Sequence, residues 1–206
     1  MDEDNHYIAG WNTPNDWANF SKELEVGENS ELWEKAYKEY FLPRLELRYL
    51  NPLRILQENG TFQGEGFSMM TILCSLIEFL ESTCQGKIYR YVSNPRDLGA
   101  NEYSSSKRMF MDFLINRSPF DDYFDEDKAK DFYSNIRCGL LHEASTKNGW
   151  RIWASSTNGE MIDFQKKIVF RDQFQVAIES FIESYKTSLK SDSDFQSNFL
   201  IKWGSL

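Results

Sequence analysis

The sequence predicts a mainly α-helical fold with one inserted β-hairpin near residues 150–170. Apolar residues recur at helical spacing over most of the chain, a period typical of helices that pack on a core. The stretch 66–83 is apolar on nearly every face, which indicates a helix that is buried on several sides. Near 150–170 the period changes to two, as in a strand.

Composition and charge limit the function classes. The chain has 206 residues, 41% hydrophobic and 16% aromatic, enough for a sizeable core. Its net charge is −9, which does not favour non-specific binding to nucleic acid or anionic membranes. A phosphate-binding site therefore requires a local basic patch. The candidates for this patch, which otherwise form a solvated face, are Lys87, Arg90, Arg96, Lys107 and Arg108.

The cysteines and the N-terminus indicate the compartment. Cys74, Cys84 and Cys138 are odd in number and form no C-x-x-C pair. This pattern favours buried thiols in a reducing compartment over a disulfide framework or a zinc site. We find no signal peptide, and no stretch that reaches the roughly 18 apolar residues of a transmembrane span. We therefore expect a cytoplasmic protein with no membrane partner.

The first 60 residues contain a polar segment and then helices. Residues 1–30 are expected to be an irregular lead-in. Its expected anchors are Trp11, Trp17 and Phe20. Ser30 is the expected N-cap of the first helix, because aromatic and apolar residues recur at helical spacing from there. We expect Pro43 to end this helix or to start the next one, Pro52 to bend the chain, and Gly60 to stop it.

Glu78 lies inside the apolar helix expected over 66–83. It either emerges at an edge of the helix or is a buried acid that meets a cation, since an unpaired buried charge is costly. The pattern leaves both interpretations open.

A loop rich in Pro and Gly follows, and then a helix that Pro119 ends. Asp125 is the expected N-cap of the next helix, whose acidic first turn suits the helix dipole. This helix continues through the sequence "RCGLLHEA" and has an apolar face. The apolar face consists of Ala129, Phe132, Tyr133, Ile136, Leu140 and Leu141.

The expected hairpin pairs "WRIWAS" with "MIDFQKKIVF", because Asn158-Gly159 between them is a strong turn signal. An amphipathic helix through "RDQFQVAIESFIESYKTSL" closes the pattern. Residues 191–206 form a tail that the pattern does not assign. No repeat or linker interrupts the chain, so we expect a single domain over 1–206.

Arg137 and His142 flank an apolar run near the end of the helix that begins at Asp125. Five residues advance a helix by roughly 7.5 Å and rotate it by about 140°, so these side chains do not stack. They reach one site only if a second helix, or a second copy of this one, faces them. Gly139 costs about 1 kcal/mol in a helix but admits another backbone. The stretch therefore looks like a packing interface with a polar centre.

Several catalytic motifs are absent from the chain, which limits the reactions that this stretch can support. It has no glycine-rich phosphate loop, no G-x-S-x-G and no H-E-x-x-H. A Cys138–His142 nucleophile pair is geometrically feasible, although a buried small thiol is the simpler interpretation. An arginine and a histidine without a metal suit RNA cleavage. The histidine exchanges protons with the ribose hydroxyl or the leaving oxygen, and the arginine binds the phosphate. Otherwise, Arg137 and His142 satisfy helix carbonyls and a dimer salt bridge.

The run Arg137-Cys138-Gly139-Leu140-Leu141-His142 resembles the R-x-x-x-x-H motif of the HEPN superfamily. The resemblance extends over residues 125–190, where "RCGLLH" is followed by strands and a last helix, as in one HEPN branch. It implies a HEPN-like helical bundle and a metal-independent endoribonuclease that needs no cofactor. It also implies a homodimer in which two motifs form a composite RNA-cleaving cleft.

The resemblance carries over Arg137 and His142 as the catalytic pair. Glu78 is a supporting candidate that would orient one of them, and Cys138 and Glu143 are further supporting candidates. RNA is the expected substrate, and the expected partner is an antitoxin or another defence-system protein. The alternative is a non-catalytic HEPN-like scaffold that binds RNA or protein. Cys138, which stands where active members commonly have a polar residue, and the net acidity favour it.

Overall fold

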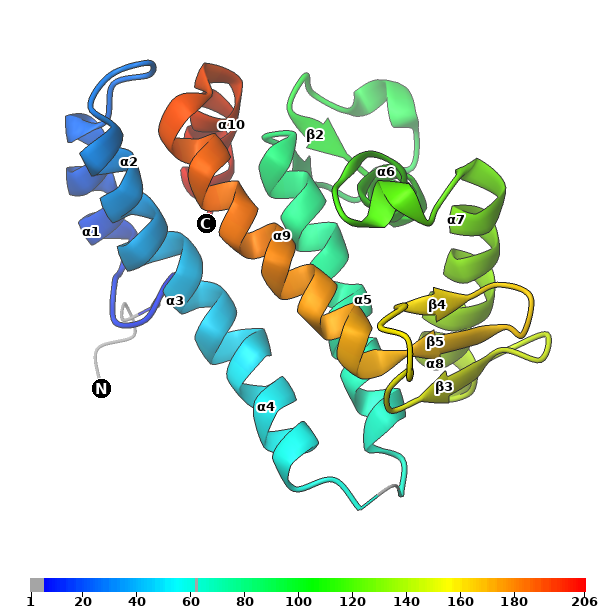
Figure 1. Cartoon of the computed structure of the whole chain (residues 1–206). Helices are drawn as coiled ribbons and strands as arrows, with labels where there is room; N and C mark the ends of the chain where they lie inside the picture. The colour runs from blue at the N-terminus through cyan, green and yellow to red at the C-terminus, as the bar shows by residue number, and fades with distance from the viewer. Residues whose placement is uncertain (1–5, 62) are drawn as a thin grey trace. The chain divides into compact units, whose positions relative to one another are not determined.

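The computed structural model describes residues 6–61 and 63–206 and is mainly helical, which confirms the predicted class (Figure 1). The α-helices are α1 (Pro14–Phe20), α2 (Ser30–Ala36), α3 (Leu42–Leu45), α4 (Asn51–Glu58), α5 (Glu65–Cys84), α6 (Ser106–Asn116), α7 (Glu126–Phe132), α8 (Cys138–Glu143), α9 (Arg171–Ser191) and α10 (Ser193–Trp203). Shorter 3-10 turns are η1 (Ser21–Glu23), η4 (Pro95–Asp97) and η5 (Phe120–Asp122), and π-helical turns are η2 (Tyr37–Phe41), η3 (Glu46–Leu50) and η6 (Tyr133–Arg137). The strands are β1 (Ile88–Tyr89), β2 (Glu102–Tyr103), β3 (Arg151–Trp153), β4 (Ile162–Asp163) and β5 (Ile168–Phe170).

The chain forms two compact units. Unit 1 consists of Met1–Pro52, Ser82–Ser104 and Ser184–Leu206. Unit 2 consists of Leu53–Glu81 and Ser105–Glu183. Each unit is described by itself below, and the single domain expected from the sequence stays a prediction.

The N-terminal segment contains a helix where an irregular lead-in is expected. Thr13 caps α1 by a capping box, in which its hydroxyl accepts from the N–H of Asp16 and the Asp16 carboxylate accepts from the N–H of Thr13 at 2.7 Å. This Thr-Pro-Asn-Asp signal predicts a helix start and was missed. Trp17 and Phe20 are buried anchors as expected, whereas Trp11 is 82% exposed, meets the ring of Tyr7 edge-on and is not a buried anchor.

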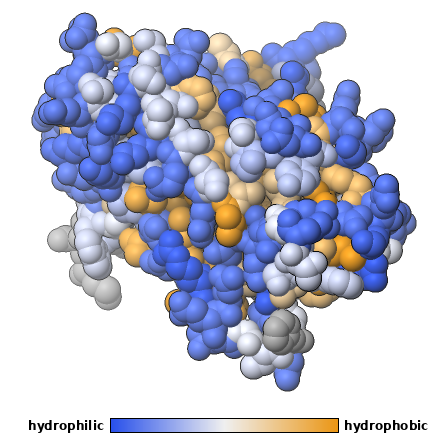
Figure 2. Space-filling model, in the orientation of Figure 1, coloured by the Kyte–Doolittle hydropathy of each residue, from blue (hydrophilic) through white to orange (hydrophobic). Residues whose placement is uncertain are grey.

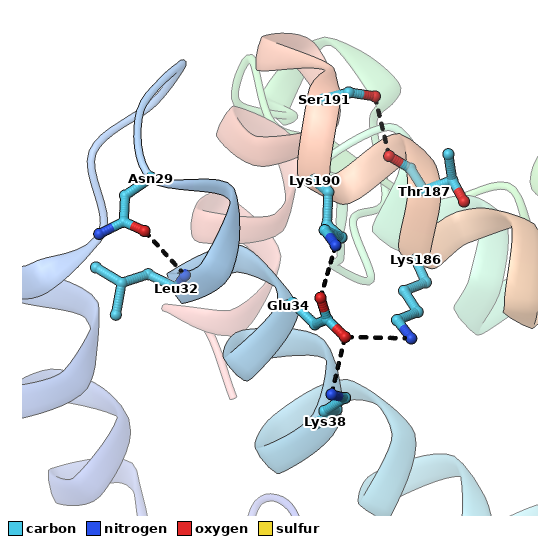
Figure 3. A network of polar contacts seen from close by, with 8 residues as sticks. All are labelled: Asn29, Leu32, Glu34, Lys38, Lys186, Thr187, Lys190 and Ser191. Carbon is cyan, nitrogen blue, oxygen red and sulfur yellow. Dashed lines mark hydrogen bonds and ion pairs between the residues drawn. The ribbon is translucent and has the colours of Figure 1, made fainter.

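The next helical path in unit 1 runs from α2 to η3 without a break. Its N-cap is Asn29 and not Ser30, because the Asn29 side chain accepts from the N–H of Leu32 (Figure 3). Pro43 lies in the first turn of α3, as one of the two expectations had it, although the helical path does not break there. It follows the π-helical turn η2, and it has no N–H for the carbonyl of Glu39. The side-chain amide of Asn12 donates to that carbonyl at 2.8 Å instead, so the carbonyl is satisfied.

Aromatic rings form the core of unit 1. Phe41 stacks on Tyr185 with ring centroids 4.6 Å apart, and Phe199 stacks on Trp203 at 4.4 Å. Phe199 and Trp203 belong to α10, so the unassigned tail is a helix that contributes to the core. Asp192 caps this helix by accepting from the N–H groups of Asp194 and Phe195.

Aromatic rings also fill unit 2, between α6, α7 and the first turns of α9. Phe132 stacks on Phe174 at 5.5 Å, and Phe113 meets Phe181 edge-on at 4.8 Å. Asp125 caps α7 by accepting from the N–H of Lys128, as predicted. The helical path from α7 through η6 to α8 thus begins in the core of unit 2, and Arg137 and His142 lie in its second half.

The sheet of unit 2 corrects the predicted hairpin. Its strand order is β3–β5–β4, with β3 parallel to β5 and β4 antiparallel to β5 (Figure 1). The hairpin therefore joins β4 to β5 at residues 164–167, and Asn158-Gly159 belongs to the longer connection from β3 to β4. Gly159 has the positive φ of 81° that the turn signal implies. The turn residue was right, and the two segments do pair, since β3 lies beside β5, but their pairing is parallel and is therefore not the expected hairpin.

Helix α5 matches the predicted apolar helix. By length and composition it is the one described helix that could cross a membrane, whereas the sequence is expected to contain none. In the structure 61% of its apolar window is buried, as in the core helices of many folded domains. On the face drawn in Figure 2, hydrophilic residues dominate the surface and apolar residues show in small groups.

Candidate functional site

Arg137 is the last residue of the π-helical turn η6, which links α7 to α8. In this turn the N–H of Cys138 donates to the carbonyl of Tyr133, five residues back. A π-helical turn holds one residue more than an α-helical turn, so it shifts the faces of the residues that follow. Such turns occur frequently at functional sites.

The guanidinium of Arg137 faces helix α5. Its Nη2 lies 3.9 Å from a carboxylate oxygen of Glu78, and its Cζ lies 5.3 Å from the ring centroid of Tyr133. The side chains of Arg137 and Glu78 are 20% and 21% exposed. Glu78 thus combines both interpretations left open by the sequence, since it emerges at a helix edge and also meets a cation. At 3.9 Å the pair is longer than a hydrogen bond.

Tyr133 and two thiols surround this pair. Burial raises the pKa of Tyr133, Arg137 opposes that rise, and a hydrogen bond with the side chain of Cys138 adds to it. Burial raises the pKa of the Cys74 thiol to about 12, so Cys74 stays protonated and unreactive near neutral pH. Cys138 is half-buried. Its contact with Tyr133 gives it a packing role in this cluster.

His142 lies in the last turn of α8 and is exposed. Among the described residues it has no hydrogen-bond or ion-pair partner, so the structure does not join it to Arg137 within one copy. Glu143 is also exposed, and its carboxylate lies 3.3 Å from Nζ of Lys147. This i, i+4 pair is a surface ion pair and does not orient His142.

Gly139 does not serve the purpose expected from the sequence. It is buried, and a Cβ added to it would lie 2.5 Å from the carbonyl oxygen of Ser145. The backbone that approaches Gly139 is thus the loop that follows α8 in the same copy. The expectation that a second copy packs across Gly139 is wrong, because that face is already filled.

A polar network that sequence reasoning missed fastens this loop to the helix. Asp131 accepts from Nε1 of Trp150 at 2.9 Å and from the amide of Asn135 at 2.7 Å. The Asn135 side chain accepts from Asn148 at 2.8 Å, and its carbonyl accepts from the N–H of Lys147 at 2.9 Å. The i, i+4 spacing of Asp131 and Asn135 was the available signal. The network holds the end of α8 in a defined position.

A shallow hollow of about 410 Å³ lies beside α8. Its lining residues are Phe67, Ser68, Thr71, Ile72, Leu140 and Ala144. Phe67 is 41% exposed, and Leu141, the neighbour of His142, is 54% exposed. The surface next to the motif is therefore partly apolar.

The basic residues expected to form one patch divide between the units. Lys87, Arg90 and Arg96 belong to unit 1, and Lys107 and Arg108 to unit 2. Arg90 pairs with Glu102 at 2.9 Å, and Arg108 lies 3.8 Å from Asp112. Two of the five charges are therefore already matched locally.

Within residues 6–61 and 63–206, no group of three or more His, Cys, Asp or Glu side chains is arranged to hold a metal ion. Comparisons with protein-family models, with curated proteins and with solved structures find no match to this chain.

Proposed function

We propose that this chain is a HEPN-type endoribonuclease that cleaves RNA without a metal ion and acts as a homodimer. The observation that supports it most is the arrangement at the end of one helical path. Arg137 is held beside Glu78 and Tyr133, and an exposed histidine follows five residues later. A guanidinium that binds phosphate and an accessible imidazole that exchanges protons can together support metal-free phosphodiester cleavage.

The reaction begins when His142 takes the proton of a ribose 2′-hydroxyl. The 2′-oxygen then forms a bond to phosphorus, and the bond from phosphorus to the 5′-oxygen breaks. The leaving 5′-oxygen takes up a proton from a histidine, and the products are a 2′,3′-cyclic phosphate and a 5′-hydroxyl. Arg137 binds the phosphate oxygens and stabilises the charge that develops on them. Glu78 orients the guanidinium.

A second copy supplies what one copy lacks. Arg137 and His142 do not contact each other within the chain, and each would face its counterpart across a two-fold axis. Because the Gly139 face is filled by the loop after α8, the contact between copies must use another face. Leu141, 54% exposed between Arg137 and His142, is the apolar side chain that such a contact would cover.

The second candidate function is a non-catalytic HEPN-like scaffold for RNA or protein. The Arg137–Glu78 pair favours it, because a carboxylate beside the guanidinium competes with a phosphate for the same charge. The half-buried thiol of Cys138 next to the motif favours it too. An antitoxin or another defence-system protein fits either candidate as a partner.

The deciding experiment is RNA digestion in excess chelator with the wild type, Arg137→Ala and His142→Ala. We expect each variant to lower the rate by about 10²–10⁴-fold, the usual contribution of a general acid or base. His6→Ala changes the other histidine of the chain and should leave the rate unchanged. Equal cleavage by the wild type and His142→Ala would contradict the proposed role of His142.

Mixing the two inactive variants tests the composite site. A mixed dimer can hold Arg137 from one copy and His142 from the other, so partial recovery of cleavage is expected. The wild-type products should carry a 2′,3′-cyclic phosphate. A scaffold would show neither recovery nor cleavage, while still binding RNA or a protein partner.

A further inference from the structure

A second, larger pocket lies in unit 2 where the first turn of α5 meets β3 and the first residue of α9. Its volume is about 580 Å³. It is lined by residues 64–67 and 152–155 and by Arg171. The pocket belongs to the same unit as Arg137 and His142, and nothing in the chemistry proposed above uses it.

The buried side of this pocket is polar, with one guanidinium and two carboxylates. Arg171 is 6% exposed, and its guanidinium lies 3.2 Å from Glu65 and 3.4 Å from Asp172. A Cβ on Gly66 would lie 3.3 Å from this guanidinium and from Ile152, so the backbone of Gly66 packs closely against Arg171. Because two carboxylates already match the guanidinium, the pocket suits an uncharged polar group better than a phosphate.

The open side of the pocket carries two exposed aromatic rings. Phe67 is 41% exposed and Trp153 is 49% exposed. The guanidinium of Arg151 lies 5.6 Å from the Trp153 ring centroid, and Phe170 meets that ring edge-on at 6.2 Å. Trp153 is therefore held in place by its neighbours while half of it faces solvent. Proteins that bind single-stranded nucleic acid stack unpaired bases on exposed aromatic rings.

Most of the charges near this pocket are paired. Lys166 lies 3.0 Å from Asp163, Lys147 lies 3.3 Å from Glu143, and Arg171 is matched by Glu65 and Asp172. Arg151 has no ion pair among the described residues, and its guanidinium donates to the Lys166 carbonyl at 3.1 Å. Arg151 is therefore a cation at this place that can meet a phosphate.

The pocket continues toward the motif. Phe67 lines both this pocket and the hollow beside α8, where Leu140 and Ala144 lie. An RNA strand that runs from the motif past Leu140 would therefore meet Phe67 first and then Trp153.

We propose that this pocket binds one unpaired base of single-stranded RNA, stacked on Trp153 and Phe67, with Arg151 at the adjoining phosphate. The identity of the ligand as RNA rests on the proposed function. The pocket sets which nucleotide lies next to the cleaved bond, so it determines specificity and takes no part in the chemistry.

The test is binding of a short, labelled, single-stranded oligoribonucleotide by fluorescence anisotropy. All variants are made in the full chain with His142→Ala, so that the RNA stays intact. Trp153→Ala should weaken binding by about tenfold, the loss expected for one stacked base. Trp153→Phe should keep most of the affinity. Trp11→Ala, which removes an indole that is 82% exposed in unit 1, is the matched control and should change nothing.

Two further variants separate stacking from a general loss of structure. Phe67→Ala should weaken binding as Trp153→Ala does, and both should melt close to the wild-type temperature because nearly half of each side chain is exposed. Arg151→Ala should lower the slope of log affinity against log salt by about one, the loss of one phosphate contact.

Each possible result supports or overturns the pocket assignment. Unchanged affinity in Trp153→Ala, no RNA binding at all, or equal Trp153-dependent binding of a duplex overturns the pocket assignment. If the wild type cleaves RNA and Trp153→Ala binds normally, the proposed function survives and this inference fails. If Trp153→Ala loses affinity and the wild type does not cleave RNA, the base pocket stands and the endoribonuclease proposal fails.

Discussion

The carboxylate of Glu81 lies one turn after Glu78 in α5 and is only 1% exposed. Arg117 donates to both of its oxygens, from Nε at 2.8 Å and from Nη2 at 3.0 Å. A bidentate pair of this kind is strong and rigid in geometry. Because removal of one partner leaves a charge buried, its loss costs far more than the loss of a surface pair.

Arg117→Ala should therefore lower the free energy of unfolding by about 3 kcal/mol. Urea unfolding followed by circular dichroism measures the change. Arg108→Ala is the control, because that side chain is 81% exposed and lies 3.8 Å from Asp112. It should change stability by less than about 0.5 kcal/mol. Similar losses in the two variants would contradict the importance of burial.

Ala144 ends α8 in the left-handed region, with φ of 50°. For a residue with a Cβ this conformation costs roughly 1–2 kcal/mol, which is why glycine is usual at this position. Ala144→Gly should thus stabilise the chain by about 1 kcal/mol in urea unfolding. Ala18→Gly, at an exposed site inside α1, should have the opposite sign. Destabilisation by both changes would show that the backbone at Ala144 is unstrained.

The sequence could place the acids of α5 in a helix but could not rank them. Glu78 and Glu81 are three residues apart, so they lie near the same face of a helix that is apolar all round. Only the position of Arg117, 36 residues from Glu81, makes Glu81 the buried member. Periodicity contains no information on such a distant partner, so the more buried of the two acids was overlooked.

Gly139 decides how α8 and its following loop fit together. The loop carbonyl of Ser145 occupies the space that a side chain would need. Gly139→Ala should destabilise the chain by about 1–3 kcal/mol in spite of the better helix propensity of alanine, because the loop must move. Ser134→Ala, at an exposed position of the same helical path, should stay within about 0.5 kcal/mol. Thermal and urea unfolding measure both, and a stabilised Gly139→Ala would contradict the close contact.

The elements of the fold were predicted well where a period extends over many residues. The helix that Asp125 caps, the apolar helix α5 and the amphipathic helix α9 follow from such periods. The sheet did not follow from its turn signal. All three residues of β5 are buried, as expected for a central strand, and β5 pairs with β3 on one edge and with β4 on the other. An Asn-Gly turn reports a permitted backbone conformation and does not choose the strand that pairs.

In unit 1 a cluster of charges connects segments that are far apart in the chain. The carboxylate of Glu34 in α2 lies 2.6 Å from Lys190, 2.8 Å from Lys38 and 3.4 Å from Lys186 (Figure 3). Two of these lysines come from α9, more than 150 residues later. Hydrogen bonds from Lys190, Lys38 and Lys186, in that order, lower the pKa of Glu34 from 4.5 to about 2.

The stability of the chain should therefore depend on pH through Glu34. A carboxyl group with a lowered folded pKa stabilises the fold above its unfolded value and loses that contribution as the pH falls. The difference in unfolding free energy between wild type and Glu34→Gln should be full above about pH 4.5 and shrink toward pH 2. Glu28→Gln, at an exposed position just before α2, is the control. A difference that does not change over this range would contradict the ion pairs.

At the scale of the whole molecule, composition and motif predicted the class of fold and the helix that carries Arg137 and His142. Of the surroundings of the motif, Glu78 was named as a supporting residue, and it lies 3.9 Å from Arg137. The loop over Gly139 was not predicted, although Ser145 is only six residues away, because helical periodicity does not show how the chain turns after a helix ends. Arg151, in β3, and the turn that holds Lys166 were not singled out, because only the sheet brings these segments together.

The π-helical turn before Arg137 sets the rotational phase of the motif. It is equivalent to one residue inserted into an α-helix. If the turn became α-helical while the chain kept all its residues, everything downstream would rotate by about 100° about the helix axis relative to α7. Arg137 would then turn away from Glu78, while Phe132 and the core before it would keep their places. Deletion of one residue from 133–136 should instead restore a regular helix and leave Arg137 facing Glu78.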